Sequence, residues 1–219
     1  MNPPPVPVAL GLLLAPRDAR LLPGWLAGNA VPFDALAVLY DDQAIPANLS
    51  DLLYDHAPQD RARVLLEARP LNRDFAAQRT RLAAMSPCPW LLMLDADERL
   101  DQAAQDLLRP ALAELLEKRP DLDVIGFPRE NRVDGELVPP DHGNARDIQF
   151  RLVRRGVSFV NTHPRQGASP GCHEVPAPCL HEFALDRQGS VAVLEQVHIL
   201  HAKSAARQRA QNSLYESYS

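Results

Sequence analysis

WLLMLDADE, residues 90–98, is the stretch of this sequence that decides the fold. Five large apolar residues run directly into Asp95, Asp97 and Glu98. A short continuous apolar run is typical of a strand buried on both faces. We therefore predict a strand over Trp90–Leu94, with the acids just past its carboxyl end, where open α/β sheets bind their ligands.

The three acids repel one another unless a cation or a network of hydrogen-bond donors lies among them. Side chains two residues apart at a strand end point the same way, so Asp95 and Asp97 can share one target. Oxygen ligands of this kind suit Mg²⁺ or Mn²⁺, which proteins hold with one or two carboxylates plus substrate phosphates. The alternative is an acidic turn that caps the next helix, with Asp97 or Asp101 as the N-cap of Gln102–Lys118.

Composition limits the class of protein. A chain of 219 residues, 46% hydrophobic, can bury one sizeable core, and a net charge of −5 argues against a general nucleic-acid binder. No apolar run reaches the roughly 18 residues of a transmembrane segment, and the apolar start Val6–Ala15 lacks the basic region of a signal peptide. The three cysteines make no disulfide framework. We expect a reduced, cytoplasmic protein, with a peripheral position at the inner membrane surface left open.

About 130 residues at the start alternate strands with helices, which is the pattern of a parallel sheet covered by helices on both faces. The predicted strands are Val8–Leu14, Ala35–Tyr40, Val64–Glu67, Trp90–Leu94 and Val124–Phe127. The predicted helices are Arg17–Ala30, which Pro23 disturbs, Leu49–His56, Arg73–Met85, with Asn72 as its N-cap, and Gln102–Lys118.

The second part of the chain is less regular. Arg129–Arg146 is polar and rich in Gly, Pro and Asp, which predicts a hairpin or loop. Two strands are predicted over Asp147–Val153 and Val157–Val160, followed by an irregular stretch over Asn161–Leu185. Val191–Leu200 is mostly apolar, and a polar helix is predicted to start at 201 and run toward 215.

Several segments together resemble one known family. Residues 90–98 are similar to the hydrophobic strand and DxD motif of family 2 glycosyltransferases, which have the GT-A fold. Asp74–Arg79 resembles that family's FA-x-x-R-N helix, with Thr80 where asparagine is usual. Residues 147–155 resemble the R-L-F-R segment of the lipopolysaccharide-core-like branch, and Ile199–His201 resembles its closing strand.

The resemblance implies a single α/β domain over residues 1–219, with a GT-A-like, Rossmann-type, mostly parallel central sheet flanked by helices and an irregular C-terminal lobe. Residues 6–130 would bind the nucleotide, and residues 131–219 would form the acceptor-side lobe and a C-terminal helix. It further implies metal-dependent, inverting transfer of a sugar from a nucleoside diphosphate sugar to an unidentified acceptor, which is a saccharide, a lipid-linked molecule or a protein.

The same likeness implies roles for individual residues. Those implied to bind the donor are Asp41, which would receive the nucleobase, Arg79, Asp95 and Arg151. Those implied to hold Mn²⁺ or Mg²⁺ are Asp95, Asp97 and His201. A cation there would stabilise the charge that develops on the diphosphate leaving group. An inverting reaction also needs a carboxylate to take the acceptor's proton, and Glu182, then Glu174, are the candidates, each following a histidine.

Other interpretations stay open on the sequence. On spacing alone, an arginine such as Arg79 on a helix face is more often solvated, and a histidine after a buried strand is more often only hydrogen-bonded. The protein could be a catalytically degenerate nucleotide-sugar-binding protein, or a phosphohydrolase with Asp95 as nucleophile. A nucleotidyltransferase would need an early glycine-rich loop, which 14–18 lacks. A structural zinc would use residues whose spacing fits no common module: Cys172, His173, Cys179 and His181.

Overall fold

The computed structural model describes residues 6–29, 33–56, 63–72, 74–138, 148–162, 173–176, 190–204 and 206. Its strands are β1 (Val8–Leu14), β2 (Ala35–Tyr40), β3 (Val64–Ala68), β4 (Trp90–Met93), β5 (Glu98–Leu100), β6 (Val124–Val133), β7 (Glu136–Leu137), β8 (Ile148–Arg154), β9 (Phe159–Thr162), β10 (His173–Pro176), β11 (Val191–Val193) and β12 (Ile199–Lys203). Its helices are the 3₁₀ helix η1 (Pro16–Leu21) and the α-helices α1 (Leu22–Asn29), α2 (Ala47–His56), α3 (Phe75–Met85) and α4 (Gln102–Lys118).

One ten-stranded sheet organises the protein, with strand order β3-β2-β1-β4-β8-β6-β12-β5 and with β7 and β11 each paired to β6. The first four strands of this order are parallel, as the sequence predicts. β8 then runs antiparallel to both β4 and β6, so the remaining half of the sheet is mixed. β9 and β10 form a separate two-stranded ribbon. None of the described helices is long and apolar enough to cross a bilayer.

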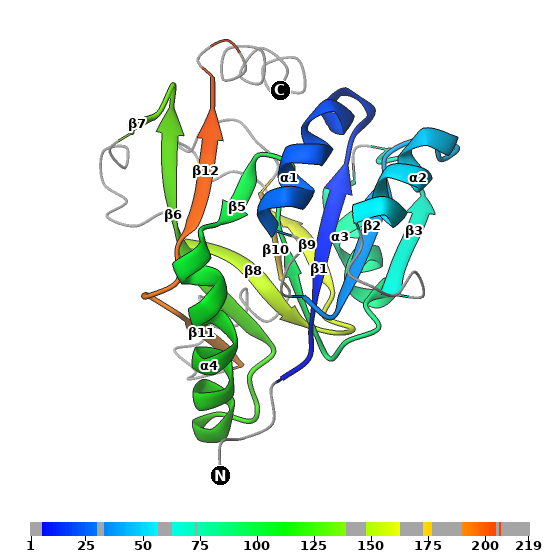
Figure 1. Ribbon diagram of the computed structural model, residues 1–219. Coiled ribbons are helices and arrows are strands. Elements are labelled where there is room, and N and C mark those ends of the chain that lie inside the picture. Colours follow the sequence, from blue (N-terminus) through cyan, green and yellow to red (C-terminus); the bar gives the residue numbers. More distant parts are fainter. Residues whose placement is uncertain are drawn as a thin grey trace.

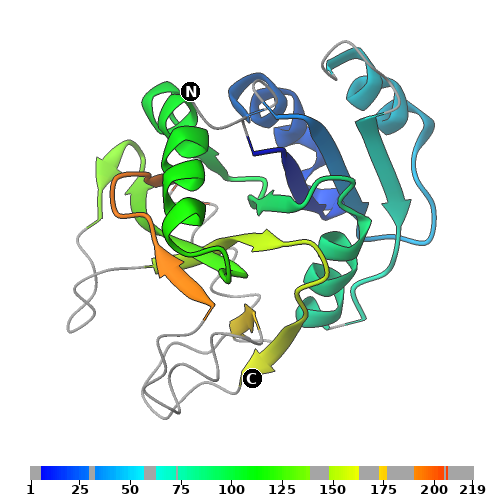
Figure 2. The same ribbon diagram turned by 90° about the horizontal axis from the view of Figure 1, so that it is seen from below.

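The sheet has a hydrophobic core on each face. Successive side chains of a strand point to opposite faces, so β1 contributes to both cores. Val8, Leu10 and Leu12 belong to the core that includes residues of α1, α2 and α4. Ala9 belongs to the core that includes residues of α3 and β9. Figures 1 and 2 show this arrangement, with α1, α2 and α4 on one side of the sheet and α3 on the other.

Two helices test the predicted boundaries. The helix expected over Arg17–Ala30 is instead the 3₁₀ helix η1 followed by α1, and Pro23 stands in the first turn of α1. A proline is tolerated there because the first-turn N–H groups have no partner within the helix. α4 has the predicted bounds, and its N-cap is Asp101, whose Oδ1 accepts a hydrogen bond from Ala104 N at 2.8 Å. The alternative N-cap, Asp97, is therefore wrong.

The predicted N-cap of α3 is also wrong. Asp74, not Asn72, caps the helix, because its Oδ1 accepts a hydrogen bond from Ala77 N at 2.9 Å. Asn72 has a φ of 48°, in the left-handed region that asparagine tolerates better than most residues. It therefore lies in the turn that precedes the helix.

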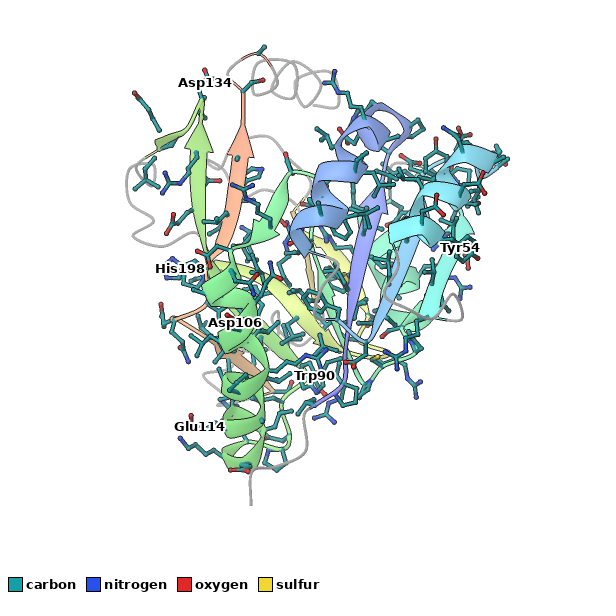
Figure 3. The ribbon with its side chains drawn as sticks, in the orientation of Figure 1. Tyr54, Trp90, Asp106, Glu114, Asp134 and His198 are labelled. Atoms are coloured by element: carbon teal, nitrogen blue, oxygen red, sulfur yellow. The ribbon has the colours of Figure 1, made fainter. Side chains whose placement is uncertain are left out.

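The polar stretch Arg129–Arg146 is partly a hairpin. β6 continues past the predicted end at Phe127 as far as Val133 and pairs with β7. The two turn residues, Asp134 and Gly135, both have positive φ, 50° and 89°, as a two-residue hairpin loop requires. Figure 3 labels Asp134 at this tip of β6.

Three short strands differ from the predictions. β5 and β10 were not expected, and β12 contains His201, so the predicted helix start at this residue is wrong. β12 pairs with β5 on one side and with β6 on the other, which satisfies its backbone groups in an extended conformation. β8 and β9 lie within two residues of their predicted positions.

The close packing at Gly126 yields a test of the sheet. The pairing of β6 with β8 shifts by one residue between Ile125 and Gly126, and a Cβ on Gly126 would lie 2.7 Å from Cγ2 of Ile148. We predict that Gly126→Ala lowers the free energy of unfolding by about 1–3 kcal/mol, measured by urea denaturation. Gly24→Ala is the control, because a Cβ there meets no atom within 4 Å; it should stabilise α1 by about 0.5–1 kcal/mol. Equal stability of the two variants would contradict this packing.

Candidate functional site

The three acids lie in a tight turn that joins β4 to β5. Leu94 N donates to Gly11 O at 3.0 Å, which holds the start of the turn against β1. Glu98 N donates to Asp95 O at 2.9 Å, and Asp95 N donates to Oε2 of Glu98 at 3.1 Å. Two hydrogen bonds between Asp95 and Glu98 thus close the turn. We call residues 95–98 the acidic turn.

Two arginines hold the carboxylate of Asp95. Nη2 of Arg79, from α3, lies 3.1 Å from Oδ1, and Nη2 of Arg151, from β8, lies 2.7 Å from Oδ2. Both arginine side chains are buried. Burial raises the pKa of the Asp95 carboxyl, but the positive charges of Arg151 and Arg79 outweigh burial and hold this pKa well below its usual range. Asp95 is therefore ionised throughout the physiological pH range.

Glu98 is the third carboxylate of the acidic turn and is completely buried, with a side chain that is 0% exposed. Its Oε1 accepts from Nη2 of Arg151 at 2.8 Å and from Nη1 of Arg129 at 3.4 Å. The same nitrogen of Arg151 thus bridges Glu98 and Asp95. A buried charge is tolerated only with such partners, so Glu98 holds the turn together and is not available to a ligand.

Helix α1 supports the acidic turn from the other side. Trp25 Nε1 donates to Asp95 O at 3.1 Å, and Asn29 Nδ2 donates to Glu98 O at 3.3 Å. Oδ1 of Asn29 in turn accepts from Leu100 N at 3.1 Å. Trp25 and Asn29 are four residues apart on one helix face, which lets both reach the turn. The sequence gives no local signal for these contacts, because each joins residues about 70 positions apart.

Asp97 differs from its two neighbours because it pairs with a histidine. Its Oδ2 lies 3.3 Å from Nε2 of His201, and each side chain is only 10% exposed. Ala202 N also donates to Asp97 O at 3.3 Å, which fixes β12 against the turn. On its other side, His201 Nδ1 lies 2.7 Å from Oδ1 of Asn131 on β6. Sequence reasoning missed Asn131, since it lies in the stretch expected to be a loop.

The pair of Asp97 and His201 suits a divalent cation. Ligand atoms lie about 2.0–2.2 Å from Zn²⁺ or Mg²⁺, so two ligands of one ion are about 3–4 Å apart. The 3.3 Å between Oδ2 and Nε2 falls in this range. Within the described part of the chain, however, no three His, Cys, Asp or Glu side chains form a group that could hold a metal ion. Asp95, the third predicted ligand, directs its carboxylate to arginines, and its role as a ligand stays a prediction.

The remaining predicted residues lie at other positions. Asp41 follows β2 at the same edge of the sheet, and its Oδ1 accepts from Leu71 N at 2.6 Å. Thr80, where the family has asparagine, accepts a hydrogen bond from Phe159 N at 2.8 Å and so ties α3 to β9. Glu174 lies in β10, opposite Asn161 of β9. Outside the described residues are Glu182, Cys172, Cys179 and His181.

Comparisons with known proteins find a likeness of structure alone. No protein-family model and no curated protein matches the chain. The crystal structure of TarS from S. aureus, a glycosyltransferase, does match, with a TM-score of 0.55 and 11% sequence identity. The match covers 90% of this chain and 37% of TarS, so the chain spans just over a third of the length of that protein. The fold is GT-A-like. At this identity the likeness to TarS extends to the fold and no further.

The buried position of Glu98 yields a test of the acidic turn. We predict that Glu98→Gln lowers the free energy of unfolding by about 3–5 kcal/mol, because it removes the buried negative charge that faces Arg151 and Arg129. The control is Glu67→Gln, which removes a half-exposed ion pair with Arg81 and should cost only about 0–1 kcal/mol. Urea denaturation of both variants gives the comparison. A cost for Glu98→Gln as small as that for Glu67→Gln would show that the turn does not depend on this charge.

Proposed function

We propose that the protein transfers a sugar from a nucleoside diphosphate sugar to an acceptor, with Mn²⁺ or Mg²⁺ held by Asp97 and His201 and, directly or through water, by Asp95. One observation carries the proposal: a carboxylate and an imidazole from distant parts of the chain lie 3.3 Å apart, next to an aspartate held by two buried arginines. This pairing lies where the parallel strands β1 and β4 end, the edge at which α/β sheets bind nucleotides.

The charges around the acidic turn support a cation and a diphosphate together. The charged groups are three arginines and three carboxylates: Arg79, Arg129, Arg151, Asp95, Asp97 and Glu98. With His201 neutral, their sum is zero. A divalent cation would bring two positive charges, which match the two negative charges of a nucleoside diphosphate ester. When bound, the cation would act as a Lewis acid that takes up charge on the leaving diphosphate.

The residues of the chain itself would orient the donor. Arg79 and Arg151 are fixed by Asp95, so a phosphate that arrives beside them meets guanidinium groups that need no reorganisation. Asp41, at the end of β2, is our candidate contact to the nucleobase. Glu182 or Glu174 would accept the proton of the acceptor hydroxyl as the sugar is transferred with inversion.

The geometry favours this function over a phosphohydrolase. A nucleophilic aspartate needs an oxygen lone pair directed at the phosphorus atom. Both carboxylate oxygens of Asp95 accept hydrogen bonds from arginines, whose positive charges hold its pKa low and so make it a weak nucleophile. The catalytically degenerate binding protein shares the whole donor site with the enzyme, and turnover distinguishes the two.

Donor binding is the first test. We predict that a nucleoside diphosphate or its sugar raises thermal stability only together with Mn²⁺ or Mg²⁺, since a ligand at about 100 Kd adds about 2.7 kcal/mol to the native state. Asp97→Asn should abolish this shift. Asp123→Asn, which removes an ion pair with Arg154, is the control and should keep the shift. The absence of a metal-dependent shift with any nucleotide would overturn the proposal.

The general base is tested by measuring turnover of the donor that the thermal-stability experiment identifies. We predict that either Glu174→Gln or Glu182→Gln lowers the release of nucleoside diphosphate by about 10²–10⁴-fold while donor binding stays unchanged. Glu117→Gln on the exposed face of α4 is the control. Normal turnover in both variants would mean that another group accepts the proton. Donor binding by the wild type without any turnover would favour the degenerate binding protein.

A further inference from the structure

His201 has a defined neighbour at each ring nitrogen. Nε2 faces Oδ2 of Asp97 at 3.3 Å, and Nδ1 faces Oδ1 of Asn131 at 2.7 Å. The imidazole is buried, and Asn131 lies directly opposite it in the parallel pairing of β12 with β6. The two strands therefore set the distance between the amide and the ring.

The partner at Nδ1 decides what Nε2 can do. A neutral imidazole carries one N–H, and its other nitrogen presents a lone pair. An amide oxygen only accepts hydrogen bonds, so its position next to Nδ1 requires the proton there. The lone pair of Nε2 then points toward the carboxylate of Asp97. Two atoms with lone pairs at 3.3 Å stabilise each other only with a proton or a metal cation between them.

We propose that Asn131 is a positioning residue that holds His201 as the Nδ1–H tautomer, so that Nε2 is presented to a divalent cation together with Asp97. The inference rests on the proposed function, because that function supplies the cation. It assigns a role to a residue outside the acidic turn. Outer partners of this kind typically change metal affinity by about 10–100-fold when they are lost.

A second histidine, just before β12, provides a comparison. His198 precedes β12, and its Nδ1 lies 3.2 Å from Oε1 of Glu130, while its Nε2 lies 3.0 Å from the backbone O of Glu195. Its side chain is 44% exposed, and Figure 3 shows it at the outer edge of the molecule. Glu130 and Asn131 are neighbours on β6, so their side chains lie on opposite faces of the strand. His198 thus has a carboxylate at one ring nitrogen, as His201 does, but it is exposed and has a backbone carbonyl in place of the amide at the other nitrogen.

The tautomer can be measured without any metal. Long-range ¹H–¹⁵N spectra of the full chain, at a pH where the ring is neutral, distinguish the two tautomers, and His201→Ala assigns the signal. We expect the Nδ1–H form in the wild type and in Asn131→Asp, whose carboxylate also only accepts. Asn131→Leu should switch the ring to the Nε2–H form, which donates to Asp97. An Nε2–H ring in the wild type, or no change in Asn131→Leu, would overturn the inference.

Binding of Mn²⁺ alone, followed by the loss of its free-ion EPR signal, gives the second readout. We expect Asn131→Leu to bind Mn²⁺ 10–100-fold more weakly, Asn131→Asp to bind at least as tightly as the wild type, and His198→Ala to be unchanged. Equal affinities of Asn131→Leu and the wild type would overturn this inference alone, provided that Asp97→Ala and His201→Ala lose binding. If Asp97→Ala and His201→Ala bind Mn²⁺ normally, or if the wild type binds none, both this inference and the metal site of the proposed function are wrong. Urea midpoints confirm that each variant is folded.

Discussion

The buried carboxylate of Glu98 is the group on which the rest of the site depends. It accepts from the backbone of Asp95, from Arg151 on β8 and from Arg129 on β6, so one side chain links the acidic turn to two further strands. Buried ion networks of this kind are often no more stabilising than apolar residues of similar volume, although the loss of one partner alone is costly. Their value then lies in what they position. Here the network of Glu98 positions Arg151 against Asp95, and so fixes the orientation of both side chains.

The three adjacent acids are held by two different means. The sequence requires either a cation or a network of donors among them, and in the structure each of the three has polar partners. Asp95 and Glu98 are satisfied by arginines and backbone groups, whereas Asp97 faces the imidazole of His201. A cation would compete with two arginines for Asp95, whereas at Asp97 it would lie beside an imidazole, which can itself bind a metal ion. This difference is the physical reason to expect the two aspartates of the motif to have unequal roles.

The sequence predicts the elements whose signals are local. Continuous apolar runs locate β1 and β2 to the residue, and an N-capping aspartate with amphipathic spacing locates α4. β5 could not be predicted, because Glu98-Arg99-Leu100 is extended only through its pairing with β12, a hundred residues later. The same reason explains the wrong prediction of a helix at His201. Strands of three to five residues have too few side chains to show a period of their own.

For the site, residue types could be predicted but partners could not. The DxD motif points to Asp95 and Asp97, and the helix upstream of it points to Arg79. On local pattern alone, however, an arginine on a helix face is expected to be exposed to solvent. Burial of Arg79 follows only from its contact with an aspartate at the end of a neighbouring strand. Asn131, in a stretch whose composition predicts a loop, becomes a neighbour of His201 because β6 continues beyond its apolar part. These contacts depend on the strand order, which no local pattern encodes.

Helix α3 connects the two sides of the site through consecutive residues. Arg79 reaches Asp95 at the acidic turn, and Thr80 accepts the backbone N–H of Phe159 at the start of β9. β9 pairs with β10, which contains Glu174, so this candidate base belongs to a ribbon tied to the same helix as the arginine. Thr80 therefore has a structural role, since its hydroxyl fixes the ribbon to α3. Two consecutive residues of α3 therefore tie the acidic turn and the ribbon of β9 and β10 to the same helix.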